Sequence, residues 1–127
     1  MARPKKTILV VEDNEQNLEL VQFLLEEAGH LVVAARDAGT ARIAFRSAMP
    51  DLVLMDMHLP GRDGLSLVHE FRLDPFGGDV PIVALTAHAM RGDRERFLAG
   101  GCTGYIPKPI DAGTFASEVA RFLPRGR

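Results

Sequence analysis

The sequence has a single cysteine, Cys102, and lacks any long apolar run. One cysteine cannot form an intramolecular disulfide or a multi-cysteine zinc site, and it suits the reducing cytosol. No apolar stretch approaches the roughly 20 residues that a bilayer-spanning helix needs, and no secretory signal precedes the first strand-like segment. We therefore expect a cytoplasmic protein without a membrane partner.

An excess of charge of one sign is also absent. The formal net charge is -2, with 25% charged and 46% apolar residues, which is ordinary for a soluble protein. Such a balance gives no bulk electrostatic attraction to nucleic acid, so no nucleic-acid partner is expected. The basic opening, residues 1–6, is interpreted as a flexible, solvated segment rather than a nucleic-acid-binding tail.

Internal repeats, low-complexity segments and interdomain linkers are missing as well. The 127 residues fit one domain, which can bury about two-thirds of its unfolded surface. We expect that domain over residues 7–123, followed by a short tail, 124–127. Its opening Met1, and its end just after the last helix, favour a natural single-domain protein over a domain cut from a larger kinase.

Short apolar runs alternate five times with segments of helical periodicity. This alternation predicts an α/β fold with a parallel sheet covered by helices. The expected strands are 7–11, 30–35, 52–56, 81–86 and 104–107. The expected helices run from Asp13 or Asn14 to Gly29, over 38–47, from 65 to about 74, over about 91–99, and onward from about Asp111. The fourth helix offers mainly Phe97 and Leu98 for burial, which predicts a loosely held helix.

Polar side chains stand where the predicted strands end. In a doubly wound parallel sheet, active groups collect outside the carboxyl ends of the strands. Glu12 and Asp13 end the first strand, Asp56 the third and Thr86 the fourth, and Lys108 follows the fifth. Three neighbouring carboxylates repel one another, and a divalent cation with oxygen ligands relieves that repulsion. The pattern predicts a site for Mg²⁺, in which Mn²⁺ could substitute.

This set of residues fits phosphoryl transfer. An Asp56 carboxylate oxygen can attack a phosphoryl group, while the Lys108 ammonium and the Thr86 hydroxyl stabilise charge on its oxygens. Taken singly, each residue also has an ordinary role as a helix cap, a turn residue, a strand residue or an exposed charge. Their shared position at one sheet edge favours the functional interpretation.

The motifs together resemble the receiver domains of two-component response regulators over residues 7–123. The matching segments are residues 8–14, 52–61, 81–87 and 108–109. Segments 14–17 and 87–93 look most like single-domain regulators of the DivK type. The resemblance implies a (βα)5, flavodoxin/CheY-like fold with strand order 2-1-3-4-5. It also implies a phosphoryl donor, either a histidine kinase or a histidine phosphotransfer protein, and a downstream protein target.

The same resemblance implies roles for particular side chains. Asp13 and Asp56 would bind the metal directly, Glu12 through water, and His58 through its backbone carbonyl. Glu12 is an accepted variant of the family's usual aspartate. The His58 side chain, like that of His88, then either tunes the lifetime of the phosphoryl group or is an ordinary loop histidine.

Three further features near the site follow from the resemblance. The Lys108–Pro109 bond would be cis, which would aim Lys108 inward, and the small Ala87 would leave the site open to a donor histidine. Tyr105 would be a switch residue that turns inward when Thr86 moves, remodelling the fourth helix, fifth strand and fifth helix. The alternative for Tyr105 is a fixed, half-buried strand aromatic.

Two other functions share part of this pattern. A haloacid-dehalogenase-like phosphatase normally carries a second acid two residues after its nucleophile, where this chain has His58. A flavodoxin-like FMN carrier would place phosphate where Glu12 and Asp13 repel it. We therefore expect a signalling domain, monomeric or weakly dimeric, that catalyses only its own phosphorylation and dephosphorylation.

Overall fold

The structure, a computed structural model, describes residues 6–59, 62–75, 77–87 and 92–124 and confirms the predicted α/β architecture. The strands of the main sheet are β1 (Thr7–Val11), β2 (Leu31–Ala35), β3 (Leu52–Asp56), β6 (Ile82–Thr86) and β7 (Gly104–Pro107). The helices are α1 (Glu15–Glu27), α2 (Ala38–Ala48), α3 (Gly64–Arg72), α4 (Asp93–Ala99) and α5 (Phe115–Ala120).

All neighbouring strands of this sheet pair in parallel, in the order β2-β1-β3-β6-β7. Counted in chain order among the strands of the sheet, this is the predicted order 2-1-3-4-5. The strand order reverses beside β1, which lies between β2 and β3. The carboxyl ends of β1 and β3 therefore lie side by side, at the place where doubly wound sheets bind their ligands.

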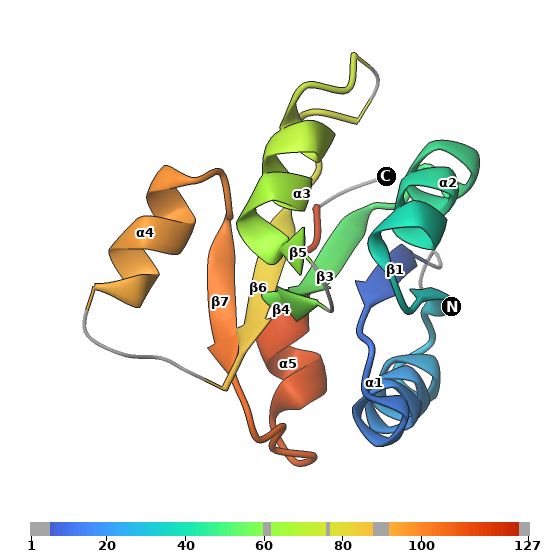
Figure 1. Cartoon of the computed structure of the whole chain (residues 1–127). Helices are drawn as coiled ribbons and strands as arrows, with labels where there is room; N and C mark the ends of the chain where they lie inside the picture. Colours follow the sequence, from blue (N-terminus) through green and yellow to red (C-terminus); the bar gives the residue numbers. More distant parts are fainter. Residues whose placement is uncertain (1–5, 60–61, 76, 88–91, 125–127) are drawn as a thin grey trace.

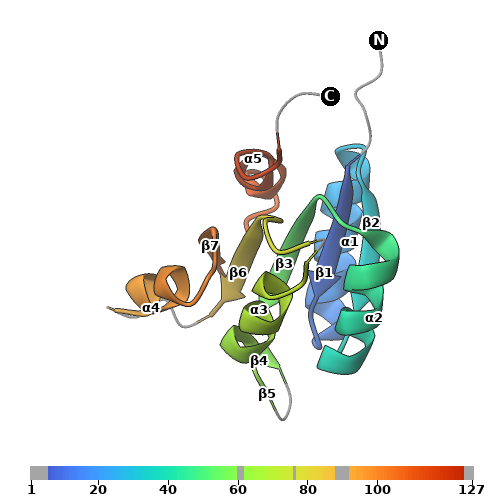
Figure 2. The same cartoon turned by 90° about the horizontal axis from the view of Figure 1, so that it is seen from above.

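The helices cover both faces of the sheet, with α3 and α5 on opposite sides (Figures 1 and 2). Successive strand side chains point to opposite faces, so each strand contributes to two separate cores. One core joins the sheet to α1 and α5 through buried side chains that include Ile8, Leu54, Val21, Leu25 and Phe115. The other joins it to α2, α3 and α4 through side chains that include Leu9, Met55, Phe45, Phe71 and Phe97.

Side chains at the helix starts place the loops that follow the strands. Asn14 and Asp37 each accept a hydrogen bond at 2.8 Å, from the backbone N–H groups of Asn17 and Thr40. These bonds satisfy N–H groups that have no partner inside the helix. Asn14 therefore is the cap of α1, and the neighbouring Asp13 keeps its carboxylate for the sheet edge.

The last helix begins later than predicted, at Phe115 instead of near Asp111. The Asp111 side chain accepts a hydrogen bond from the Gly113 N–H at 2.9 Å, and the Asp111 carbonyl accepts one from Thr114 at 3.2 Å. These local bonds stabilise a turn that competes with helical structure. The sequence signal at Asp111 marks that turn, and α5 follows it.

Two further details differ from the prediction. Of the two apolar residues expected to bury α4, Phe97 is buried but Leu98 is 41% exposed. A short antiparallel pair of strands, β4 (His58–Leu59) and β5 (Arg62–Asp63), follows β3 where only a turn was predicted. The start of the fourth helix predicted near residue 91 lies outside the described residues.

Cys102 is buried, and this burial raises the pKa of its thiol to about 11, so it is protonated at neutral pH.

α1, the longest described helix, has 13 residues. Within the described ranges, no helix has the length and apolar character that a membrane crossing requires.

Candidate functional site

Three carboxylates meet at the carboxyl edge of the sheet. Glu12 follows β1, Asp13 comes next, and Asp56 ends β3, the strand beside β1. One carboxylate oxygen from each residue lies within 4.8 Å of the others. Glu12 is fully buried and Asp56 is only 3% exposed, while Asp13 is half-buried. The adjacent strand ends thus bring together the acids that were predicted to converge.

Lys108 faces this cluster from the end of the sheet's last strand. Its Nζ atom lies 2.9 Å from Glu12 Oε1 and 3.6 Å from Asp56 Oδ1, and its side chain is only 15% exposed. The backbone N–H of Lys108 donates to the Thr86 carbonyl at 2.8 Å, which fixes the start of this loop to β6. The Lys108–Pro109 peptide bond is cis.

Backbone donors hold the carboxylates in place. The His58 N–H donates to Asp56 Oδ1 at 3.0 Å, and the Asn14 N–H donates to Glu12 Oε2 at 3.2 Å. The Glu12 N–H itself donates to the Ala35 carbonyl at 2.9 Å, which continues the pairing of β1 with β2. Fixed positions of this kind preorganise the site before any ligand arrives.

The electrostatics of the cluster disfavour its full negative charge. Burial raises the pKa of Asp56, and the nearby Glu12 charge raises it further, although the His58 N–H and Lys108 act in the opposite direction. Loss of solvent contact also raises the pKa of Asp13, and so does its contact with Asp56. Three acids facing one ammonium leave an excess of negative charge, and their oxygen atoms fit a hard divalent cation.

The remaining predicted residues differ in burial and in their place in the sheet. Thr86 is fully buried at the end of β6, and Ala87 beside it is exposed. Tyr105 lies opposite Ala84 in the β6–β7 pairing and is partly buried against the core shared with α2, α3 and α4. His58 is an exposed residue of β4. The other predicted loop histidine, His88, lies outside the described residues.

Two residues near the site were not predicted. Arg36 Nη2 donates to the Asp13 carbonyl at 3.3 Å, and its position directly after β2 could have indicated that it reaches the same sheet edge. At Gly64, a Cβ atom would lie 2.7 Å from Met57 Cα and 3.0 Å from the Asp56 carbonyl oxygen. The start of α3 can approach Asp56 closely because Gly64 has no side chain.

A parallel sheet of this order, with clustered acids and a lysine at its carboxyl edge, defines the CheY-like class of signalling domain. Residues 8–120 match the response regulator receiver domain family, and the chain belongs to that family. The polar-differentiation response regulator DivK of Brucella anthropi is 38% identical over 118 residues, which cover 93% of this chain and 96% of that protein. The chain is thus similar to single-domain regulators of the DivK type, as predicted.

Solved structures agree with this assignment. The chemotaxis response regulator CheY4 of Vibrio cholerae matches with a TM-score of 0.89 at 26% identity. The match covers 94% of this chain and 100% of the CheY4 chain. The receiver domain of the sensor histidine kinase PA1611 from Pseudomonas aeruginosa PAO1 has a TM-score of 0.84 at 35% identity. That match covers 94% of this chain and 98% of that one, and the structure has a magnesium ion coordinated in its active site cleft.

Proposed function

We propose that this domain accepts a phosphoryl group from a phosphohistidine donor onto Asp56 in a Mg²⁺-dependent reaction. The observation that supports this most directly is the position of the Lys108 ammonium, 3.6 Å from Asp56 Oδ1, beside two further carboxylates. A buried carboxylate with a cation at one side and acids at the other fits a nucleophile that works together with a metal ion.

Asp13 and Asp56 would hold the metal, with Glu12 acting through water and His58 through its backbone carbonyl. The residues fit such an ion because they offer oxygen ligands, because Lys108 offsets only part of their negative charge, and because the half-buried Asp13 leaves the site partly open. When bound, Mg²⁺ neutralises this charge and polarises the phosphoryl oxygens; Mn²⁺ would serve similarly.

In the transfer step, an Asp56 carboxylate oxygen forms a bond to phosphorus while the bond from phosphorus to the donor imidazole nitrogen breaks. The electron pair of the broken bond returns to that nitrogen, which takes up a proton. Lys108 Nζ and the Thr86 hydroxyl would stabilise the charge on the phosphoryl oxygens. Lys108 would turn from Glu12 toward the phosphoryl group, a short movement for an ammonium already between the two acids.

Access for the donor supports the same function. Ala87, directly after Thr86, is small and exposed, so the edge beside Asp56 has room for an incoming histidine. The proposed donor is a histidine kinase or a histidine phosphotransfer protein, and the phosphorylated domain would bind a downstream protein target. The exposed side chain of His58 would tune the lifetime of the acyl phosphate, and His88 is proposed for the same role.

The signal would pass from Thr86 to Tyr105. A hydrogen bond to the phosphoryl group would draw the Thr86 hydroxyl toward Asp56, and Tyr105 would turn into the space that it leaves. The partly buried position of Tyr105, on the strand next to Thr86, is compatible with such a rotation. The change would shift the population of conformations on the face formed by α4, β7 and α5.

The proposed activity stops at the domain's own phosphorylation and dephosphorylation, within residues 7–123. We propose a cytoplasmic phosphorelay component, monomeric or weakly dimeric, without nucleic-acid or membrane partners. Hydrolysis of generic phosphomonoesters would instead support a phosphatase, and a yellow colour in the purified protein would support a flavin carrier.

Incubation with acetyl phosphate and Mg²⁺ tests the proposal. The wild-type protein should gain one phosphoryl group, and the label should disappear with a metal chelator or with Asp56→Asn. The substitution keeps the size of the side chain and the acceptor for the His58 N–H, so loss of label reports chemistry and not a broken loop. Equal labelling of the variant would reject Asp56 as the acceptor.

A further inference from the structure

Arg72, the last residue of α3, joins two loops at the end of the sheet opposite the acid cluster. Its Nε donates to the Gly101 carbonyl at 2.8 Å, and its Nη1 donates to the Gly78 carbonyl at 2.9 Å and also to the Val80 carbonyl. Its Nη2 donates to Thr103 Oγ1 at 3.3 Å. One guanidinium thus connects the segment before β6 with the turn between α4 and β7.

The same turn packs directly on α3. A Cβ atom at Gly100 would lie 2.5 Å from Leu65 Cδ2, and one at Gly101 would lie 3.3 Å from Val68 Cγ1 and 3.2 Å from Arg72 Cγ. The three α3 residues recur at steps of three and four, so they share one face of the helix. The turn at the carboxyl end of α4 therefore packs against α3 and is also hydrogen-bonded to it through Arg72.

Arg72 is suited to this position by its shape. A planar guanidinium offers five donors in a fixed fork, whereas a lysine ammonium is a compact point charge that cannot span separate carbonyls in the same way. Burial lowers the pKa of Arg72. A guanidinium remains charged in proteins, so its hydrogen bonds are charge-assisted. Removal of the side chain would leave backbone carbonyls of two loops without these donors.

The opposite end of α4 is held differently. Its N-cap residue, Gly92, has a φ of 92° and makes no side-chain capping bond, and Phe97 is the buried residue of this helix. α4 is thus attached near its carboxyl end, through Phe97 and through the Arg72-bound turn. A displacement of this helix would be smallest at that turn and largest at its amino end.

We propose that Arg72 is the anchor of the α4–β7 turn, holding it on α3 while the amino end of α4 moves when Asp56 is phosphorylated. The part that concerns phosphorylation rests on the proposed function; the anchoring itself does not. Arg72 would act as a positioning residue for signalling and would take no part in phosphoryl transfer.

Amide hydrogen exchange of Arg72→Met tests the anchor in the metal-free protein. The relevant N–H groups are those of Gly101, Cys102 and Thr103, which donate at 3.2, 3.0 and 2.6 Å to Leu98, Phe97 and Ile82. Because the substitution removes the charge-assisted hydrogen bonds of the Arg72 guanidinium, exchange of these three N–H groups should become about tenfold faster or more. Arg72→Lys, a milder change that covers the case in which Arg72→Met does not fold, should show a smaller increase.

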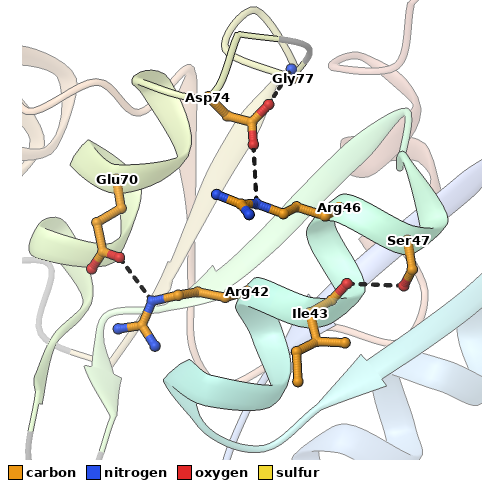
Figure 3. Close-up of polar contacts among 7 residues, drawn as sticks. All are labelled: Arg42, Ile43, Arg46, Ser47, Glu70, Asp74 and Gly77. Atoms are coloured by element: carbon orange, nitrogen blue, oxygen red, sulfur yellow. Dashed lines mark hydrogen bonds and ion pairs between the residues drawn. The ribbon is translucent and has the colours of Figure 1, made fainter.

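Arg42→Met is the matched control. Arg42 pairs with Glu70 of α3 at 2.8 Å, across the seam between α2 and α3, where Arg46 also lies near Asp74 (Figure 3). This variant likewise removes a guanidinium that links α3 to a neighbouring segment, and it should leave exchange in the α4–β7 turn within about twofold of wild type. A global loss of stability in Arg72→Met would speed exchange everywhere, whereas a lost anchor acts first on the turn.

Exchange with beryllofluoride and Mg²⁺ tests the signalling part. In the wild type, amides of Asp93–Arg96 should change while those of Gly101–Thr103 stay constant; in Arg72→Met, both groups should change. The inference is overturned if both Arg72 variants leave exchange in the turn at wild-type rates, or if the wild-type turn responds as strongly as the start of α4. Failure of acetyl phosphate to label Asp56 would reject the proposed function alone, because the metal-free comparison still decides the anchor.

Discussion

Lys108 reaches back across the sheet edge to Glu12, with its Nζ atom 2.9 Å from Glu12 Oε1. The two residues lie 96 positions apart in the chain, and the order of the strands brings them together. Glu12 thereby does two things: it adds to the negative charge that favours a cation, and it holds the lysine beside Asp56. A cation at the site would compete with Lys108 for the same buried carboxylate.

Glu12→Gln should weaken Mg²⁺ binding. The change removes one negative charge from the cluster but keeps the side-chain length and an acceptor for the Asn14 N–H. Loss of a residue that supports metal ligands typically costs about ten- to a hundredfold in affinity. Titration with Mg²⁺ followed by amide chemical shifts measures the effect. Glu15→Gln, at an exposed position on α1, is the control, and unchanged affinity in Glu12→Gln would contradict the role assigned to Glu12.

Asp56→Asn should stabilise the metal-free protein at neutral pH. The pKa of Asp56 is raised in the folded state, so protonation of this side chain favours folding. This contribution to stability is fully present below the unfolded pKa near 3.8, and it is lost as the pH rises through the folded pKa. The wild type therefore carries a penalty at pH 7 that the variant avoids. Urea unfolding at pH 7 and pH 3 with chelator measures the difference, which should shrink at pH 3. If the wild type were as stable as the variant at pH 7, the ionised Asp56 carboxylate would not destabilise the fold, which would contradict this prediction.

Tyr105→Ala should leave phosphorylation intact and weaken the response to it. Tyr105 lies on β7 and packs against the core that includes Phe97 of α4, and it is not one of the residues of the acid cluster. Acetyl phosphate labelling should stay within about twofold of wild type, as expected for a residue outside the site. The beryllofluoride-induced shifts of amides in α4 and α5 should decrease. Tyr105→Phe, which keeps the ring, should retain them, and full shifts in the alanine variant would identify Tyr105 as a fixed strand residue.

Gly64→Ala should destabilise the domain and disturb the loop after Asp56. The new methyl group would meet backbone atoms of Met57 and Asp56 that cannot move independently of β3. Overpacking of this kind typically costs about 1–3 kcal/mol. The matched control is Gly39→Ala in α2, where a Cβ atom meets only Asp37 Oδ1 at 3.6 Å and should be tolerated. Equal unfolding midpoints for the two variants would show that the close approach at Gly64 does not affect the free energy of unfolding.

The order of elements could be predicted because it depends on local patterns. The apolar run Thr7–Val11 has the pattern of a buried strand, and the spacing of Leu18, Val21 and Leu25 is that of an amphipathic helix. The cap Asp37 was predicted, and the cap of α1 was narrowed to Asp13 or Asn14, since a side-chain acceptor before a helix has a local partner. The convergence of the acids followed from the rule that parallel strands end at the same edge.

What the sequence could not provide are contacts between distant residues that share no local signal. Arg36 and Arg72 look like ordinary surface arginines until the fold places carbonyl groups beside them. Leu98 looked like a core residue but faces solvent, because the short α4 buries only one side. The start of α5 was misplaced because Asp111 caps a turn with the same chemistry that could have capped the helix.

Borohydride reduction of the phosphorylated protein tests the central claim most directly. An aspartyl phosphate is reduced to homoserine, so the labelled residue can be located by peptide mass spectrometry after treatment with acetyl phosphate and Mg²⁺. We predict homoserine at position 56 alone, and none without Mg²⁺ or in Lys108→Met, which retains the backbone N–H that bonds the Thr86 carbonyl but removes the ammonium. Homoserine at Asp13, or at position 56 in the absence of any divalent cation, would contradict it.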